Sequence, residues 1–155
     1  MIAGSVYTPR LIACGEIRLP VRLPLSERLA TLLSGLACVI EQHAPSEAAV
    51  EAPFHGASAR SSLQLAHARG VVLAALGTSN VQVFEYSPAT IKKAVTGNGR
   101  AEKSQVEAMV FRLVPGGGSA GRPDMADAIA AALCHLFGTK PAELLRKTGV
   151  AEMRR

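Results

Sequence analysis

The alternation of hydrophobic and polar positions predicts that strands and helices follow one another along this chain. Two runs of β-type residues flank Pro9 within residues 5–19, which predicts a hairpin. Apolar residues recur at helical spacing through residues 25–44, which predicts an amphipathic helix that Ser26 is placed to cap. The apolar stripe of this helix consists of Leu29, Leu32, Leu33, Leu36, Val39 and Ile40. A short apolar strand is expected next, at residues 46–54.

The same alternation continues to the last helix. We expect a helix at residues 58–76, a strand at 81–86, a short helix that opens at Ser87 and Pro88, a helix at 101–114, a glycine-rich loop at 115–121 and an alanine-rich helix after it. Strands that alternate with helices through short loops pair in parallel, so the fold class is expected to be α/β. No repeat or linker interrupts the chain, which predicts one domain at residues 1–140 and a basic tail at 141–155.

Composition and charge narrow the class of protein. The chain has 155 residues, of which 48% are hydrophobic and 19% charged, a balance typical of a single globular domain. Its net charge of +5 favours a polyanionic partner such as nucleic acid, and charge that only maintains solubility is the alternative. The cysteines and histidines form no zinc-binding pattern, and no apolar run reaches membrane-spanning length. We therefore expect a reduced, cytoplasmic protein with no membrane partner.

The only two aspartates of the chain, Asp124 and Asp127, lie at the start of the alanine-rich helix. Side chains three positions apart share a helix face, with Cβ atoms about 5–6 Å apart, so the carboxylates repel each other unless a cation lies between them. Mg²⁺ prefers carboxylate oxygens, which makes the pair a candidate metal site. The alternative is helix capping, with Asp124 at the N-cap and Asp127 as the acid of a capping box.

Glu51 and Phe54 stand at the end of the predicted strand at residues 46–54. Ligands bind beyond the carboxyl ends of strands in open parallel sheets, so Glu51 is a candidate third acid, and a solvated residue at the rim is the alternative. An aromatic ring in the loop, Phe54, is placed to stack on an unpaired base or, alternatively, to cover the edge of the core. Glu51 thus adds a third candidate metal ligand to the site, and Phe54 adds a candidate contact with DNA.

Basic residues near the centre of the chain form a candidate phosphate-binding surface. Lys103 is expected in the first turn of a helix, where the helix dipole disfavours a cation, and this indicates a role such as holding a phosphate. The alternative is a solvated lysine relieved by Glu102. Lys92, Lys93 and Arg100 would line the same face. For Lys92 and Lys93 the alternative is structural, because a cation at the end of the preceding short helix suits the helix dipole.

Several motifs resemble, in order, those of the RuvC-type Holliday junction resolvases over residues 46–137: VEAPF, AHARG, VFEYSPATIKKAVTGNGRAEKSQVEAMV and DMADAIAAAL. The resemblance implies an RNase H-like fold, with a mixed five-stranded sheet flanked by helices. It implies a metal-dependent endonuclease that binds four-way junction DNA as a homodimer. Such an enzyme cuts strands during homologous recombination and DNA repair and leaves 5′-phosphate ends. A branch-migration helicase complex is a further partner that the family implies.

The resemblance also implies a role for each matching residue. Three acids correspond to the ligands of two Mg²⁺ ions, with Mn²⁺ as an alternative: Glu51, Asp124 and Asp127. Two lysines correspond to residues that face the active site, Lys92 and Lys103, with Lys103 near the scissile phosphate. Phe54 corresponds to the aromatic residue that enters the centre of the junction.

One part of the family pattern has no counterpart in this sequence. The family's first strand carries a fourth acid in a G-[IV]-D-P-G motif, which is absent here. We therefore expect the natural protein to start upstream of Met1 by on the order of 10–20 residues, and this chain to be poorly stable and nearly inactive. Two alternative functions follow: a junction-binding protein with impaired catalysis, and an RNase H-like nuclease that acts on structured RNA.

Replacement of Phe54 tests the stacking hypothesis. We expect Phe54→Ala to weaken binding to a four-way junction by about 1–3 kcal/mol, because an unpaired base loses its aromatic partner. The measurement is the Kd for a synthetic junction without Mg²⁺, with a linear duplex as the control substrate because its bases remain paired. A variant that binds and cuts junctions normally would instead support the core-edge interpretation.

Overall fold

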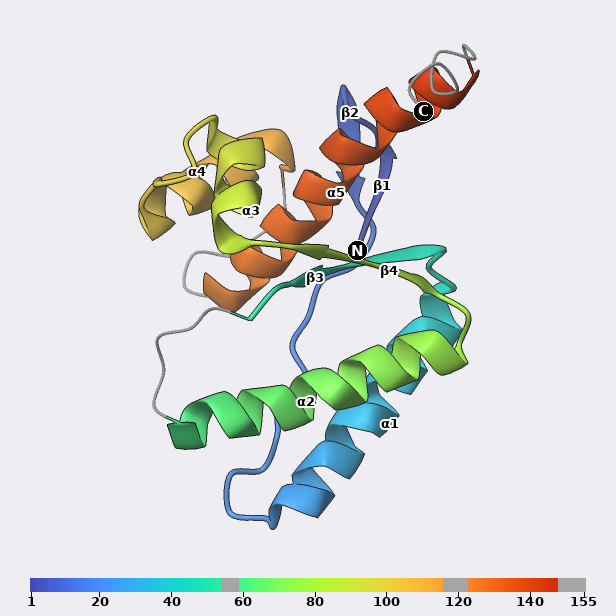
Figure 1. Cartoon of the computed structure of the whole chain (residues 1–155), viewed down its shortest axis with the longest axis vertical. Helices are drawn as coiled ribbons and strands as arrows, with labels where there is room; N and C mark the ends of the chain where they lie inside the picture. Colours follow the sequence, from blue (N-terminus) through green and yellow to red (C-terminus); the bar gives the residue numbers. More distant parts are fainter. Residues whose placement is uncertain (54–58, 116–122, 148–155) are drawn as a thin grey trace, which may run out of the picture. The chain divides into compact units, whose positions relative to one another are not determined.

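The computed structural model describes residues 1–53, 59–115 and 123–147, in which strands and helices alternate from α1 to α3 (Figure 1). In chain order the elements are β1 (Ile2–Ser5), β2 (Thr8–Leu11), α1 (Leu25–His43), β3 (Glu47–Glu51), α2 (Ala59–Thr78), β4 (Gln82–Tyr86), α3 (Pro88–Thr96), α4 (Lys103–Leu113) and α5 (Pro123–Lys147). They belong to two compact units: unit 1 consists of Met1–Cys14 and Tyr86–Arg155, and unit 2 of Gly15–Glu85. The expected domain extent, residues 1–140, stays a prediction, and α5 continues past it to Lys147.

β1 and β2 form the expected hairpin, but its turn comes before Pro9. The strands pair antiparallel, and Gly4 lies opposite Pro9 within the ladder. The Ser5 hydroxyl accepts the backbone N–H groups of Tyr7 and Thr8 at 3.3 and 3.2 Å, which closes the turn. Pro9 is tolerated in β2 because a two-stranded sheet has free edges where a residue without an N–H costs little. The expectation that Pro9 separates the two strands is therefore wrong.

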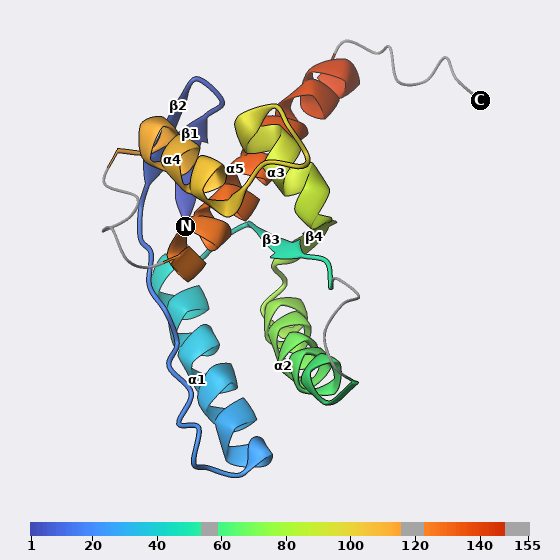
Figure 2. The same cartoon turned by 90° about the vertical axis from the view of Figure 1, so that its left-hand side faces the viewer.

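α5 is the central helix of unit 1, because β1, α3 and α4 all pack against it (Figure 1, Figure 2). Its buried side chains recur at helical spacing and include Met125, Ala126, Ile129, Ala130, Leu133 and Cys134. The facing helices contribute Ile91 and Val95 from α3 and Val106 and Val110 from α4. Burial of this stripe by three elements fixes the rotation of α5 about its own axis.

The start of α3 is where the sequence predicted it, and a glycine defines its end. Ser87 is the N-cap, its hydroxyl accepts the Thr90 N–H at 3.1 Å, and Pro88 occupies the first helical position. Gly97 ends the helix in the left-handed region, with a φ of 79°. The chain therefore turns sharply between α3 and α4.

Unit 2 pairs β3 with β4 and packs α1 against α2. α2 carries the chain back between the two strands, so β3 and β4 run in the same direction (Figure 1). The buried core of this unit includes Ile40 from α1, Ala75 and Leu76 from α2, and Val81, which directly precedes β4. The parallel pairing expected from the alternation of strands and helices is thus observed in this unit.

The start of α1 differs from the expectation. The helix begins at Leu25, and Pro24 occupies the N-cap position without a side-chain hydrogen bond. Ser26 lies inside the first turn, so the prediction that it caps the helix is wrong. The helix starts two residues earlier than a Ser26 cap would require, because Pro24 and not Ser26 occupies the N-cap position.

The α/β class expected from the sequence is confirmed. The residues that the structure describes contain four strands in two separate pairs, β1–β2 and β3–β4. The resemblance implied one mixed sheet of five strands. Within the described ranges no strand is hydrogen-bonded to both pairs. No helix in these ranges is both long enough and apolar enough to cross a membrane.

Replacement of Gly4 is expected to destabilise unit 1. Gly4 has a φ of 110°, and a Cβ atom at this position would overlap the carbonyl oxygen of Thr8. Backbone strain of this kind costs about 1–3 kcal/mol, and each kcal/mol lowers the Tm by roughly 2–4 °C in a chain of this size. The measurement is the Tm of Gly4→Ala by circular dichroism.

Gly77→Ala in α2 is the matched control for this substitution. Nothing lies within 4 Å of a Cβ atom added at Gly77, and alanine is favoured over glycine inside a helix by roughly 0.5–1 kcal/mol. The control is expected to raise the Tm. Equal Tm values for the two variants would contradict the assignment of strain to Gly4.

Candidate active site

Asp124 and Asp127 lie on the exposed side of α5, near its start. The helix begins at Pro123, whose fixed φ suits the first helical position. Met125 and Ala126, between the two aspartates, are buried, so the packing of α5 leaves both carboxylates exposed. Asp124 is inside the first turn and is not the N-cap that the capping alternative requires. The helix dipole still favours a carboxylate in this turn.

Lys103 is held beside these aspartates by the start of α4. Glu102 is the N-cap and forms a capping box, in which the Gln105 side chain accepts the Glu102 N–H at 2.9 Å. Lys103 is the first residue of α4, and its Nζ donates to Oδ2 of Asp127 at 2.8 Å. This hydrogen bond is the main cause that raises the pKa of Lys103 above its usual value, and the negative charges of Asp127 and Asp124 add to it. The partner of Lys103 is thus Asp127, while Glu102 caps the helix.

The contact between Lys103 and Asp127 is open to solvent. The two side chains are 56% and 46% exposed, so a ligand can reach both. Lys103 donates to Asp127, and the negative charge of Asp124 also acts on its ammonium group, so the acid pair attracts a cation. Carboxylate oxygens are also the donors that Mg²⁺ and Mn²⁺ prefer, so the chemistry of the residues fits such an ion.

The third acid belongs to the other unit. Glu51 is the last residue of β3 in unit 2 and is exposed, whereas Asp124 and Asp127 belong to unit 1. Among the side chains that the structure describes, no three His, Cys, Asp or Glu residues are gathered in a way that could hold a metal ion. The convergence of Glu51 with the aspartates therefore stays a prediction. Phe54 lies outside the described residues.

Arg69 is a residue near Glu51 that sequence reasoning did not assign to the site. Its Nη1 donates to the backbone carbonyl of Glu51 at 3.0 Å, and its Nη2 forms an ion pair with Oε2 of Glu85 at 2.5 Å. The side chain of Arg69 is only 17% exposed. The signal in the sequence was the AHARG motif, which contains Arg69 and was noted without a role for the arginine.

A second unassigned contact connects the end of β4 to α5 within unit 1. The Tyr86 hydroxyl and Nδ1 of His135 form a hydrogen bond of 2.8 Å, and their rings are 5.9 Å apart. His135 is buried, and it lies on the same helix as Asp124 and Asp127. The contact helps to hold α5 in place, since a buried polar group is stable only with a partner. No spacing in the sequence indicates this pair, because the two residues are 49 positions apart.

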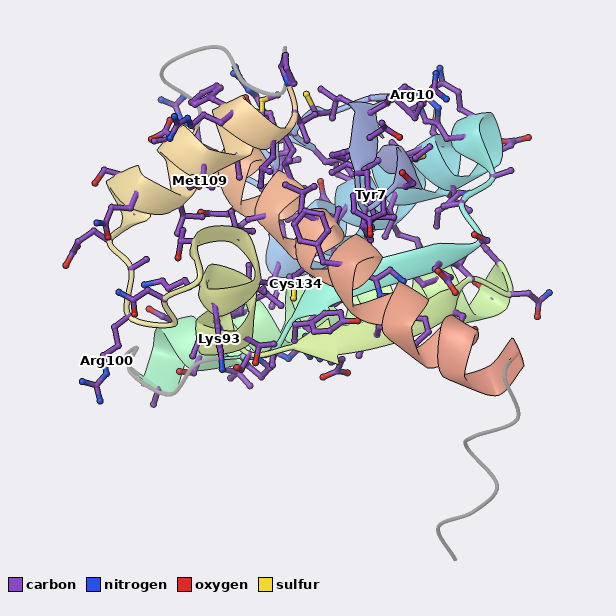
Figure 3. All side chains as sticks on the ribbon, turned by 90° about the horizontal axis from the view of Figure 1, so that it is seen from above. Tyr7, Arg10, Lys93, Arg100, Met109 and Cys134 are labelled. Carbon is purple, nitrogen blue, oxygen red and sulfur yellow. The ribbon has the colours of Figure 1, made fainter. Side chains whose placement is uncertain are left out.

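Lys92, Lys93 and Arg100 lie at or near the turn between α3 and α4. Lys93 and Arg100 are exposed, and Lys92 is half-buried. The Asn98 side chain accepts the Arg100 N–H at 3.0 Å, and the Thr96 hydroxyl donates to the Lys92 carbonyl at 2.8 Å. Figure 3 shows Arg100 extending away from the helices, and Lys93 on the last turn of α3. The turn presents positive charge to solvent, as a phosphate-binding surface requires.

Comparison with known proteins gives consistent matches over most of the chain. The family model described as crossover junction endodeoxyribonuclease RuvC matches residues 2–135. A protein of that name from Azorhizobium caulinodans is 45% identical over 135 residues, which cover 87% of this chain and 79% of the relative. Another from Zymomonas mobilis is 48% identical over 124 residues, which cover 80% of this chain and 74% of the relative.

A solved structure shares the fold. The RuvC protein of T. thermophilus in complex with a Holliday junction substrate matches with a TM-score of 0.83 and 29% sequence identity. The match covers 91% of this chain and 86% of the solved one. The RNase H-like architecture expected from the sequence is thereby confirmed.

Replacement of Lys103 is expected to leave the fold almost unchanged. The ion pair with Asp127 is exposed, and exposed pairs contribute less than about 1 kcal/mol to the free energy of unfolding. Lys103→Met should therefore change that free energy by less than this amount in urea denaturation. Lys93→Met, which removes another exposed lysine of unit 1, is the control. A loss well above that of the control would contradict the surface character of the pair.

Proposed function

This chain belongs to the RuvC family of crossover junction endodeoxyribonucleases, and we propose that its active site consists of Glu51, Asp124, Asp127 and Lys103. The enzyme resolves Holliday junctions in homologous recombination and DNA repair. In the proposed reaction, water attacks a phosphodiester phosphorus and the bond to the 3′ oxygen breaks. The products are a 5′-phosphate and a 3′-hydroxyl end, which a ligase can rejoin.

The observation that carries this proposal is the contact of Lys103 with Asp127 beside Asp124. The three acids would hold two Mg²⁺ ions, or Mn²⁺, through their carboxylate oxygens. When bound, such ions lower the pKa of a water nucleophile and stabilise the leaving oxygen. The chain's own cation, Lys103, would offset negative charge on the phosphoryl oxygens in the transition state. Lys103 is charged at neutral pH, because the ordinary pKa of lysine already lies well above 7 and that of Lys103 is raised further.

Lys103 has two anionic partners in this proposal, one at a time. In the structure its ammonium group donates to Asp127. A DNA phosphate that enters the site offers a second acceptor of the same charge type, and the contact is exposed enough for the exchange. Release of Lys103 toward the phosphate would free a carboxylate oxygen of Asp127 for a metal ion. The same side chain thus connects substrate binding to the acid pair.

The remaining basic residues are proposed to bind the DNA backbone. Lys92, Lys93 and Arg100 supply positive charge beside the turn between α3 and α4, and the whole chain carries a net charge of +5. Phe54 is proposed to stack on an unpaired base at the centre of the junction. We further propose a homodimer, because two symmetric cuts need two active sites, and a branch-migration helicase complex as partner. A DNA substrate implies a cytoplasmic location.

Substitution of the acids tests the function directly. We expect Asp127→Asn and Glu51→Gln each to reduce the cleavage rate of a synthetic four-way junction in Mg²⁺ by more than about 100-fold. Loss of a residue that only supports a metal ligand reduces activity by about 10–100-fold, and loss of a ligand itself should cost more. Junction binding without Mg²⁺ should persist, because the phosphate contacts remain. The measurement is single-turnover cleavage, with Glu41→Gln on α1 as a control for the same change in charge.

The substrates in this experiment separate the alternatives. Linear duplex DNA and a structured RNA of the same length are compared with the junction, each with and without Mg²⁺. Preferential cleavage of the RNA would favour the RNA nuclease. Binding of the junction by the unsubstituted chain without any cleavage in Mg²⁺ would favour the junction-binding protein.

A further inference from the structure

The end of β3 is held by a side chain from α2. Arg69 lies within α2, which packs on the β3–β4 pair through Val72, Ala75 and Leu76. From this helix its guanidinium reaches the backbone carbonyl of Glu51 on β3 and the carboxylate of Glu85 on β4. One side chain therefore connects the helix to both strands of unit 2.

Arg69 contacts the backbone of Glu51 and not its carboxylate. This contact bears on the direction in which the Glu51 side chain leaves the backbone. Glu51 is the last residue of β3, and Ala52 and Pro53 follow it outside the strand. Pro53 has no N–H group, so the chain beyond Glu51 has fewer donors with which to continue a ladder. A hydrogen bond to the Glu51 carbonyl holds the peptide plane that follows its Cα, and the direction of the Cα–Cβ bond depends on that backbone geometry.

Arginine suits this position better than lysine. The guanidinium has several N–H groups in a fixed fork, so it can donate to a carbonyl and to a carboxylate at the same time. Arg69 uses Nη1 for Glu51 and Nη2 for Glu85. The carboxylate partner is half-exposed, whereas Arg69 is 17% exposed, so the guanidinium is the more enclosed member of the pair. Glu85 thus compensates the charge of the guanidinium that also holds the strand end.

We propose that Arg69 is a positioning residue, which holds the end of β3 so that the Glu51 carboxylate is presented to the metal ions. This inference rests on the proposed role of Glu51 as a metal ligand. It assigns to the arginine of the AHARG motif a task that acts through Glu51. Residues that support a metal ligand in this way typically change metal affinity or activity by about 10–100-fold.

The test compares Arg69→Ala and Arg69→Lys with the unsubstituted chain. We expect Arg69→Ala to weaken Mn²⁺ binding in calorimetry and to lower kcat for junction cleavage, each by about 10–100-fold, with the KM for the junction changed far less. Arg69→Lys should recover part of both losses, because an ammonium group can still donate to the Glu51 carbonyl. Hydrogen exchange of the peptide at residues 47–53 should accelerate in Arg69→Ala and not in Glu51→Gln.

Two further variants make the outcome decisive. Arg18→Ala removes an exposed arginine of unit 2 that pairs with Glu16, and it controls for the loss of one positive charge. An equal loss of Mn²⁺ affinity in Arg18→Ala, or wild-type Mn²⁺ binding and kcat in Arg69→Ala, would overturn the inference. If Arg69→Ala fails to fold, Arg69→Lys carries the same comparison. Normal cleavage by Glu51→Gln would overturn the proposed role of Glu51 as a metal ligand, whereas an inactive Glu51→Gln beside a fully active Arg69→Ala would overturn only the role of Arg69.

Discussion

The burial of one face of α5 is the constraint on which the candidate active site depends. β1, α3 and α4 all pack on this helix, and the buried stripe from Met125 to Cys134 leaves it one stable rotation. Once that rotation is fixed, the 3.6-residue period leaves Asp124 and Asp127 exposed together near the N-terminal end. The hydrogen bond between Tyr86 and His135 adds a directional contact to this apolar packing. The placement of the acid pair is therefore a consequence of the core, although neither aspartate is part of it.

The electrostatics of the site follow from two arrangements that are unfavourable when each is considered alone. Two carboxylates one turn apart repel each other, and a lysine at the start of α4 opposes the helix dipole. The structure brings the two together, so that Lys103 compensates Asp127 at 2.8 Å. Local rules are broken in this way mainly where a protein uses the residues for function. The pattern supports the assignment of these side chains to the chemistry of the enzyme, because both are exposed and neither is part of the core.

The sequence predicts those features that depend on nearby residues. The cap of α3 at Ser87, the order of the elements and the shared exposure of the two aspartates all follow from spacing along the chain. The expected roles of Pro9 and Ser26 are wrong, because a hairpin turn and a helix start can each move by a few residues at little cost. The contacts of Arg69 with Glu51 and of Tyr86 with His135 join residues 18 and 49 positions apart, and only tertiary packing creates them. Sequence reasoning could therefore name the acids but not the groups that hold them.

The acids of the proposed site are held by interactions of different kinds. Asp124 and Asp127 are carried by a helix whose backbone hydrogen bonds are internal, so their positions depend on the packing of that helix. Glu51 stands at the end of a strand, where the ladder stops, and a side chain from another element donates to its carbonyl. Arg69 is this donor and is largely enclosed, so its loss affects both the strand and the acid. In the proposed site the strand-end ligand is therefore supported by a side chain from another element, whereas the helical ligands are supported by the packing of their helix. That difference gives a physical reason for an arginine in the AHARG motif, although this arginine binds to the backbone of Glu51 and not to its carboxylate.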